Sequence, residues 1–303
     1  MAEVVRTMEE RIQRGLVAAT QVASETAART ALNGVYFAAF GETSLDDADL
    51  VRMVQAVPTL IAAALASKTY YFVPLAMAEG RNGADGRNGA EGSVGESTAH
   101  RTGKEETLIS PVYTTELADL SICHRNVALA AGIGVGAGKG IDATVPTDDQ
   151  PRDGVFISAR LLSDRFSLAF EFFINVGHAL VDEAGVPEAF SELAWKQALA
   201  DVRGETSLDA WESRAQALAQ SSPRDAKPRI DEKARTEYVE AAFSDAIAIY
   251  LLSLAVDFDY SELREREYPL LAPQALAERL RLVARLFPPN PDYQFAIRYR
   301  RRA

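Results

Sequence analysis

The sequence predicts a mainly α-helical α+β protein with a small β-sheet. Apolar residues recur at helical spacing over five stretches of the second half, at 164–183, 187–201, 206–220, 232–256 and 273–287. Aromatic and β-branched runs bounded by turn residues mark short strands at 69–75, 107–113 and 155–158. Long helices that outnumber short strands are typical of an α+β fold.

The composition is that of a globular protein with an acidic surface. The chain has 303 residues, of which 48% are hydrophobic, enough for one large or two ordinary domains. Its formal net charge of −11 argues against a general nucleic-acid binder, which needs a basic face for phosphates. The exception is the arginine-rich tail at 298–302, expected to be solvated, with docking onto an acidic partner as the alternative.

The predicted compartment is the cytoplasm. A single cysteine, Cys123, rules out an intrachain disulfide and fits a reducing environment. Charges occur throughout residues 1–15, where a signal peptide would carry an apolar run. The most apolar run, Val57 to Ser67, is shorter than the ~18 residues that a membrane span needs, so no membrane span is expected.

Residues 1–67 are predicted to form an N-terminal helical region. A stripe of apolar residues over 4–32 indicates one long helix that packs within the chain or between chains. A second helix is expected to start with Ser44 as its cap and acidic residues in its first turn. Pro58 should interrupt or restart that helix.

Residues 68–113 are predicted to hold two strands around a flexible glycine-rich loop at 78–106. The loop repeats the sequence GRNGA at 80–84 and 86–90 and contains His100, which we expect to be solvated. The strands on either side of the loop could pair across it.

A mostly helical domain is then expected over 114–303. Its first helix is predicted at 114–131, capped by Thr114 or Thr115 and carrying Cys123 and His124. The glycine-rich stretch at 132–143 lacks the spacing of nucleotide-binding loops and is predicted to be a turn-rich loop.

The stretch FFINVGHALVDEAG, Phe172 to Gly185, lies in the predicted helix at 164–183. One face of that helix is apolar, and the other carries a polar stripe formed by Ser167, Glu171, Asn175, His178 and Asp182. His178 therefore lies beside the polar seam of a largely buried helix. A hydrogen-bonded histidine at the edge of the core is the simplest interpretation.

A short strand, a long apolar helix and the residues GHAL together resemble the zincin metallopeptidases, especially the gluzincin-like group. Their H-E-x-x-H motif places two histidines on one helical face to bind zinc, with a glutamate to activate water. Only the second half of that motif is present here. The resemblance implies that His178 matches the second zinc ligand, Ile174 the first ligand and Asn175 the catalytic glutamate. Ile174 cannot bind a metal, and Asn175 cannot act as a general base.

The segment Arg235 to Ser253 resembles the helix that carries the third ligand in the same family. The resemblance implies Glu237 for that ligand, with Glu240 as the alternative, and Asp245 as a supporting buried acid. A solvated acid at the start of a helix is an equally good interpretation of Glu237. Catalytic zinc needs three protein ligands, so zinc is expected only where Cys123 or His124 completes a set with His178.

We therefore expect a catalytically inactive metallopeptidase-like protein, a pseudoenzyme that acts as a binding, scaffold or assembly component. Its expected partners are other proteins or further copies of the chain, without nucleic acid, without a cofactor and without a small-molecule substrate. A metal-dependent or Cys–His hydrolase with a rebuilt site, using Cys123 and His178, is one alternative. A helical assembly protein unrelated to peptidases, which oligomerises through its N-terminal helix, is the other.

Overall fold

The computed structural model of the protein describes seven stretches of the chain: 15–43, 45–78, 107–129, 152–159, 165–219, 230–256 and 268–297. Several predicted features lie outside them. These are the start of the N-terminal helix, the Ser44 cap, most of the glycine-rich loop with His100, the loop at 132–143 and the arginine-rich tail.

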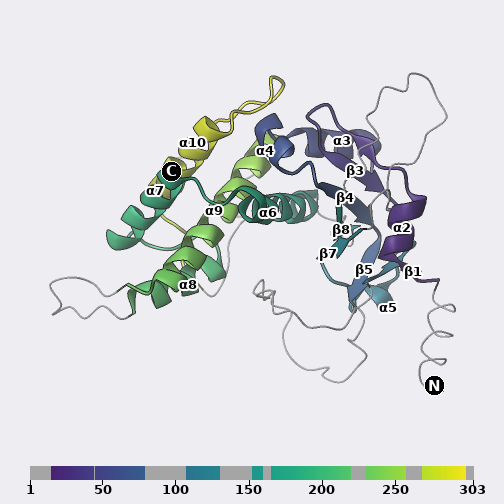
Figure 1. Cartoon of the computed structure of the whole chain (residues 1–303), viewed down its shortest axis with the longest axis horizontal. Helices are drawn as coiled ribbons and strands as arrows, with labels where there is room; N and C mark the ends of the chain where they lie inside the picture. Colours follow the sequence, from purple (N-terminus) through teal and green to yellow (C-terminus); the bar gives the residue numbers. More distant parts are fainter. Residues whose placement is uncertain are drawn as a thin grey trace, which may run out of the picture. The chain divides into compact units, whose positions relative to one another are not determined.

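The fold is α+β and mainly α, as predicted. The chain divides into two units that do not follow the predicted boundaries at 67 and 113. The first unit joins Met1–Gln55 to Ala66–Glu171, and the second joins Ala56–Leu65 to Phe172–Ala303. Figure 1 shows the strands in the first unit and most of the helices in the second.

The larger sheet of the first unit has a parallel centre and antiparallel edges. In sheet order its strands are β2 (Arg29–Thr30), β3 (Tyr36–Ala39), β4 (Lys68–Val73), β8 (Asp153–Ser158) and β7 (His124–Ala128). Strands β3, β4 and β8 are parallel, whereas β2 and β7 run antiparallel to their neighbours. The strand predicted at 155–158 is therefore confirmed. It is β8, which lies next to the edge strand β7.

The smaller sheet pairs the two sides of the glycine-rich loop. Its order is β1 (Val17–Ala18), β6 (Thr107–Ser110) and β5 (Leu75–Ala78), and all its pairs are antiparallel. The single strand predicted at 69–75 is divided at Pro74. Its first part, β4, joins the larger sheet, and β5 pairs with β6. Proline has no N–H group for a strand ladder, so the chain changes sheets there.

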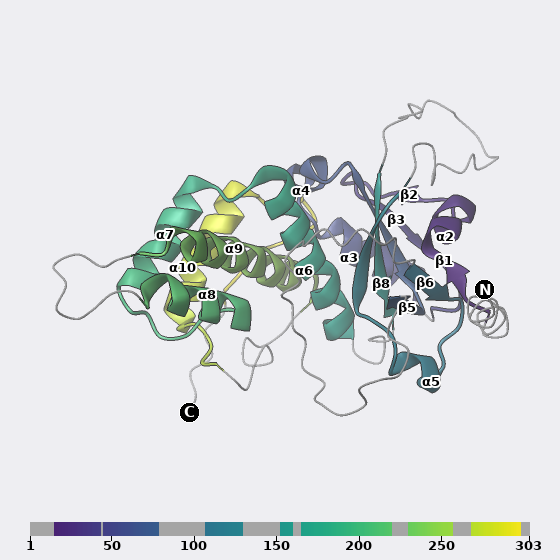
Figure 2. The ribbon, with the colours of Figure 1, turned by 60° about the horizontal axis from the view of Figure 1, so that its bottom comes forward.

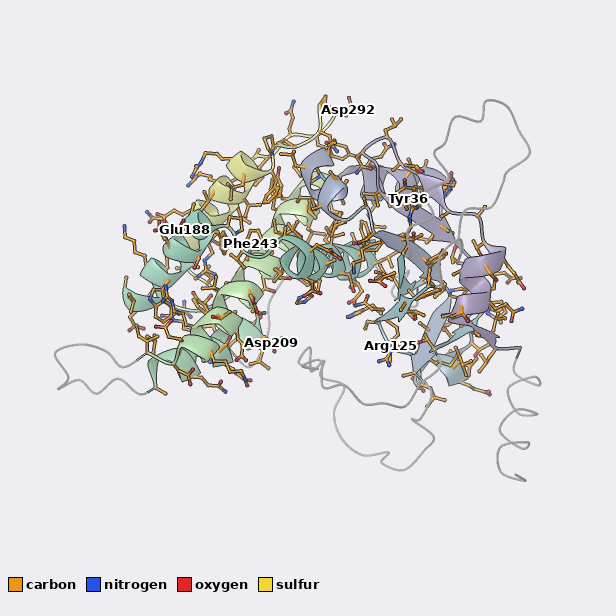
Figure 3. The ribbon with its side chains drawn as sticks, viewed as in Figure 1. Tyr36, Arg125, Glu188, Asp209, Phe243 and Asp292 are labelled. Atoms are coloured by element: carbon orange, nitrogen blue, oxygen red, sulfur yellow. The ribbon has the colours of Figure 1, made fainter. Side chains whose placement is uncertain are left out.

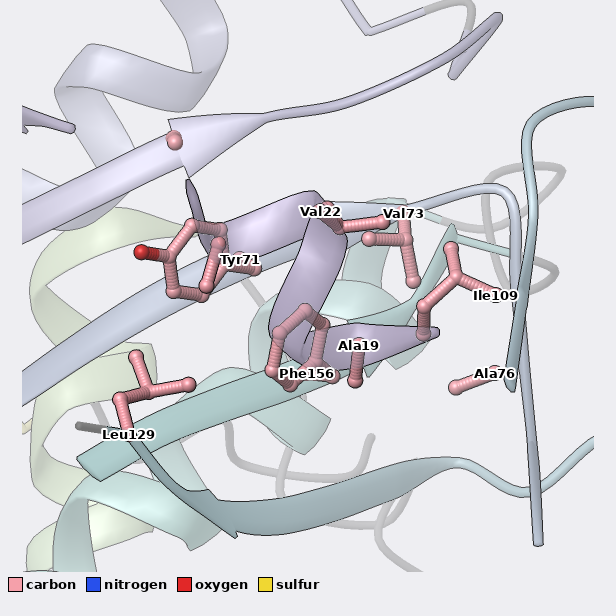
Figure 4. Close-up of a cluster of buried hydrophobic side chains, with 10 residues drawn as sticks. Ala19, Val22, Tyr71, Val73, Ala76, Ile109, Leu129 and Phe156 are labelled. Carbon is pink, nitrogen blue, oxygen red and sulfur yellow. The ribbon is translucent and has the colours of Figure 1, made fainter. Parts of the chain in front are cut away.

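Helix α2 (Ala19–Glu25) covers one face of the larger sheet. Its Ala19 and Val22 pack against a buried cluster that includes Tyr71, Val73 and Phe156 (Figure 4). Strand side chains alternate between faces, so the buried neighbours of Tyr71 on β4 point to the other side. Figure 2 shows α3 (Asp47–Gln55) on that opposite side of the sheet. Burial of both faces explains why β4 lacks the alternation of apolar and polar residues that a strand with one exposed face shows.

The long helix predicted over 4–32 is wrong in its described part, because only α2 is helical there. Thr26 after α2 is extended, and β2 then pairs with β3 through a turn in which Gly34 has a φ of 94°. The helical stripe at Val22 and Ala23 is real but lasts only seven residues. Strand pairing with β3 overrides the local helix propensity of the following residues.

The cap of α3 is supplied by Asp46. Its carboxylate accepts hydrogen bonds from the backbone N–H groups of Ala48 (2.8 Å) and Asp49 (3.3 Å). Pro58 then stands at the N-cap of a separate helix, α4 (Thr59–Ala64), which confirms the predicted restart.

The helix predicted at 114–131 is wrong. Thr114 does cap a helix, but α5 (Thr115–Ala118) lasts only four residues, and the chain continues into β7. All five β7 residues pair with β8. The long-range ladder decides the conformation here, and it moves His124 from a predicted helix to an edge strand.

The helices predicted for the second half of the chain are confirmed within one to two residues at each end. They are α6 (Arg165–Ala184), α7 (Glu188–Leu199), α8 (Leu208–Leu218), α9 (Glu232–Ala255) and α10 (Pro273–Leu286). Phe243 of α9 lies among the neighbouring helices, with its ring centroid 4.9 Å from that of Phe190 on α7 (Figure 3).

Helix α9 is the central element of the second unit. Among the described residues it alone is long and apolar enough to cross a membrane, although no membrane span was expected from the sequence. However, 67% of its most apolar window is buried inside the protein. A core helix of a folded domain has the same apolar character.

A buried polar network ties α7, α8, α9 and α10 together around Glu205. This carboxylate accepts hydrogen bonds from Arg214 (3.1 Å), Arg279 (3.1 Å) and the Tyr238 hydroxyl (3.0 Å). Arg279 also donates to the Tyr238 hydroxyl and to the side-chain oxygen of Gln197. Such a network fixes the helix arrangement because every buried charge has a partner.

Candidate functional site

Helix α6 carries Ile174, Asn175 and His178, and its burial is wider than one face. Leu168, Phe172 and Ala179 are buried along with the predicted apolar face. Along the polar stripe, Asn175 is only 5% exposed and His178 is half-buried, whereas Asp182 is exposed. Ile174, at the first ligand position of the zincin resemblance, is half-buried.

Helix α6 packs closely against α9 at Gly177. A Cβ atom on Gly177 would lie 2.5 Å from the backbone oxygen of Ser244 and 2.9 Å from its Oγ. The Ser244 hydroxyl is buried and has no hydrogen-bond partner in the described part of the chain. The glycine in the motif-like sequence GHAL thus has a packing function that needs no catalytic explanation.

Glu237, the expected third ligand, lies on the exposed face of α9. Its side chain is 47% exposed and forms an ion pair with Lys233 on the preceding turn (3.4 Å). Because Ser244 lies opposite Gly177, Glu237 is seven residues away from that crossing, about 10 Å along the helix axis. This placement fits the solvated helix-start acid that the sequence allowed.

Glu240, the alternative ligand, faces other acids. Partial burial, followed by the nearby carboxylates of Asp182 and Glu237, raises the pKa of Glu240. Lys233 is the basic partner of Glu237 beside this acidic group. The influence of Asp182 on Glu240 also shows that the ends of α6 and α9 run past each other in opposite directions.

Asp245 is a largely buried acid of α9 that accepts hydrogen bonds from residues at the start of α8. Its carboxylate accepts a hydrogen bond from the Thr206 hydroxyl (2.8 Å). Desolvation raises the pKa of Asp245 to about 6, although hydrogen bonds from Ser207 and Thr206 oppose the rise. Asp245 therefore forms its hydrogen bonds with residues at the start of α8.

The described residues do not fit a zinc ion at the position that the resemblance implies. Ile174 offers no donor atom, Asn175 is buried, and Glu237 is bonded to Lys233. Within the described stretches, no group of three or more His, Cys, Asp or Glu side chains is placed to hold a metal ion. Zinc with at least three protein ligands has no such set here.

The structure instead forms a histidine–carboxylate pair that the sequence did not predict. Nδ1 of His124 on β7 lies 2.6 Å from Oε1 of Glu171 on α6, and both residues belong to the first unit. Both side chains are partly buried. A carboxylate on one ring nitrogen fixes the ring orientation and leaves Nε2 for a second interaction. The signal that sequence reasoning missed is Glu171, already on the polar stripe of α6.

Cys123 stands directly before β7. It is half-buried, and its carbonyl oxygen accepts a hydrogen bond from the backbone N–H of Ser158 (2.8 Å). Cys123 and His124 belong to the first unit, whereas His178 and Glu237 belong to the second.

Two surface cavities of the second unit are lined by described residues. The larger, of about 380 Å³, lies between the loop after α7, helix α8 and Pro269. The smaller, of about 310 Å³, lies between Val186 and the first turns of α9, where Arg235 and Glu240 line it. Neither contains His178 or His124 in its lining.

No family model, no curated protein and no solved structure matches this chain.

Proposed function

We propose that this protein is a noncatalytic binding component with a metallopeptidase-like helical core, and that it binds another protein through the segment around α5. The observation that carries the binding proposal is a group of exposed apolar side chains, which we call the α5 patch: Val112, Tyr113 and Leu120. Exposed large apolar groups in proximity are typical of interaction sites.

The α5 patch is concentrated in a short part of the chain. In the described residues, six large hydrophobic side chains are exposed, and three of them fall within 112–120. The others, Leu32, Leu60 and Leu199, are far from one another in sequence. Tyrosine is enriched at protein interfaces because it provides apolar area together with a hydroxyl.

Hydrogen bonds hold the segment that carries the α5 patch in place. The carbonyl oxygen of Pro111 accepts from the backbone N–H of Glu42 (2.8 Å), and Thr114 caps α5. After α5, the backbone N–H of Ile122 donates to Ala76 of the smaller sheet (2.8 Å). A segment that is already ordered loses little conformational entropy on binding, which favours affinity.

The noncatalytic part of the proposal is supported by the chemistry at the motif positions. Ile174 has neither a metal-binding atom nor a proton-accepting group, and the buried amide of Asn175 cannot replace a carboxylate base. The packing of Gly177 on Ser244 gives α6 a structural role that persists without zinc.

The binding proposal is tested with paired surface variants. We expect Tyr113→Asp/Leu120→Asp to remove a saturable protein partner in quantitative affinity purification from the native host, without lowering the unfolding midpoint. Leu199→Asp is the matched control, because Leu199 is equally exposed but lies at the end of α7. Equal retention of all partners by the double variant would contradict the proposal.

The noncatalytic part is tested by metal analysis of the purified protein. We expect substoichiometric zinc in both the wild type and His178→Ala, with no peptidase activity in either. Stoichiometric zinc that is lost in His178→Ala would overturn this part of the proposal.

A hydrolase with a rebuilt site is the second candidate, and the His124–Glu171 pair favours it. A histidine oriented by a carboxylate is the arrangement of a general base. Under this candidate, hydrolysis of an activated ester would fall by a similar factor in His124→Gln and in Glu171→Gln and persist in His178→Ala. That pattern would replace the noncatalytic proposal, and equal background rates in all proteins would remove the candidate.

A further inference from the structure

The larger cavity of the second unit has a volume and a lining that suit a small ligand. Its walls include Asp201, Arg203, Trp211, Arg214, Leu218 and Pro269, which come from the loop after α7, from α8 and from the segment before α10. Its volume of about 380 Å³ is at the small end of the range for small-molecule sites.

The two terminal nitrogens of the Arg214 guanidinium differ in their hydrogen bonds: those of Nη1 are shorter than those of Nη2. Its side chain is only 7% exposed, and its Nη1 donates to the carbonyl oxygens of Val202 (2.7 Å) and Gly204 (3.2 Å) and to Glu205 (3.1 Å). Its Nη2 has only long contacts of 3.4 Å, to the Ala198 carbonyl oxygen and to Asp201. Those distances exceed the usual range for N–H···O hydrogen bonds, so Nη2 can accommodate a better acceptor.

The charge balance around Arg214 favours an anion. The one carboxylate of Glu205 lies between two buried guanidinium groups, those of Arg214 and Arg279. Asp245 acts electrostatically on Arg279, and neither residue lines the cavity. Asp201, the acid beside Nη2, is fully exposed, and solvent weakens its ion pair.

The remaining walls suit an apolar group. Trp211 is half-buried in the wall formed by α8, and Leu218 and Pro269 add apolar surface, while Arg203 is exposed at the rim. An indole ring provides a flat face for another ring. A cavity with a guanidinium in its wall and an aromatic side matches a molecule that is flat and apolar at one end and anionic at the other.

The backbone at the cavity edge is also unusual. Asp201 has a φ of 52°, and the hydrogen bonds from Asp201 to Ala198 (3.1 Å) and from Val202 to Gln197 (3.1 Å) form a Schellman motif. Glycine is the usual residue at this position, so an aspartate there is strained. In this conformation the Asp201 carboxylate lies 3.4 Å from Nη2 of Arg214.

We propose that this cavity binds a small aromatic carboxylate, with its ring against Trp211 and its carboxylate on Nη2 of Arg214 and on Arg203. Asp201 occupies the anion position while the ligand is absent, and the ligand carboxylate displaces it. Removal of the negative charge of Asp201 therefore strengthens binding, and removal of Arg203 weakens it.

The experiment uses the full chain carrying Trp195→Phe, so that Trp211 is the only tryptophan and its fluorescence reports on the cavity. Benzoate is the probe, and benzyl alcohol is the neutral probe of similar shape. We expect a saturable fluorescence change with benzoate and binding at least about tenfold weaker with benzyl alcohol, because charge-assisted hydrogen bonds are lost.

Matched variants then locate the anion. Asp201→Asn should tighten benzoate binding several-fold and Arg203→Gln should weaken it several-fold, whereas Arg235→Gln, outside the larger cavity, should leave it unchanged. No saturable change with benzoate, equal affinity for benzyl alcohol, or unchanged affinity in both cavity variants would each overturn the proposal. Arg214 is left intact because its loss would disrupt the buried network.

Discussion

Glu205 and Arg279, which are 74 residues apart in the chain, form an ion pair of 3.1 Å in which both side chains are completely buried. We expect Arg279→Met to lower the free energy of unfolding by about 3–5 kcal/mol, because Glu205 loses one of its two compensating charges. Urea unfolding followed by circular dichroism measures this. Lys233→Ala, which breaks the exposed pair with Glu237, should cost less than about 1 kcal/mol. Similar losses in the two variants would show that burial of the Glu205 pair adds nothing.

Gly177→Ala should destabilise the second unit by about 1–3 kcal/mol, because the new Cβ would overlap the backbone oxygen of Ser244. Ser244→Ala should be neutral or stabilising by up to about 1 kcal/mol, since it removes a buried hydroxyl that lacks a partner. The double variant should remain as unstable as Gly177→Ala, because the nearest atom belongs to the backbone. Rescue in the double variant, measured by thermal unfolding, would place the overlap at the Ser244 hydroxyl instead.

Asp245→Asn should stabilise the protein at neutral pH by about 1–3 kcal/mol. The pKa of Asp245 is raised to about 6 in the folded state, above its value of 3.8 when unfolded. The folded state therefore binds a proton more tightly, and this contribution is complete below pH 3.8 and lost as the pH rises through 6.

The advantage of Asp245→Asn should consequently shrink between pH 7 and pH 4. Chemical unfolding at several pH values provides the measurement, with Glu192→Gln on the exposed face of α7 as the control. A constant difference across that range would show that Asp245 titrates in the folded protein as it does in the unfolded chain.

Asp201→Gly should raise the free energy of unfolding by about 0.5–1 kcal/mol, because glycine adopts the positive φ of this position without strain. Gly185→Ala is the reciprocal control: Gly185 has a φ of 68° and open space around its Cα, so only backbone strain should lower stability there. A loss of stability in Asp201→Gly would mean that the weak contact of Asp201 with Arg214 outweighs the strain.

Local patterns in the sequence were sufficient where each helix carries its own periodicity. The helices α6 to α10 lie where they were predicted because their apolar spacing is set by near neighbours in the chain. The same periodicity failed at 4–32 and at 114–131. In both regions the residues pair with strands far away in sequence, and this pairing overrides a weak helical preference.

The candidate site shows the same division. The sequence placed Ile174, Asn175 and His178 on one helix and identified the missing ligand and base. It could not show that Glu237 is turned to solvent, because a polar residue on a helix fits either a ligand or an exposed face. Nor could it pair His124 with Glu171, since His124 was expected on a helix.

The sequence by itself determined the α+β class, the positions of the long helices and the absence of a complete H-E-x-x-H motif. The tertiary structure alone decided which distant residues meet. Residues 56–65 join the second unit, where Asn290 accepts hydrogen bonds from Thr59 and donates to Val57 across more than 230 positions. Helix periodicity depends on residues a few positions apart, whereas such pairings depend on how whole elements pack, which no short stretch of sequence encodes.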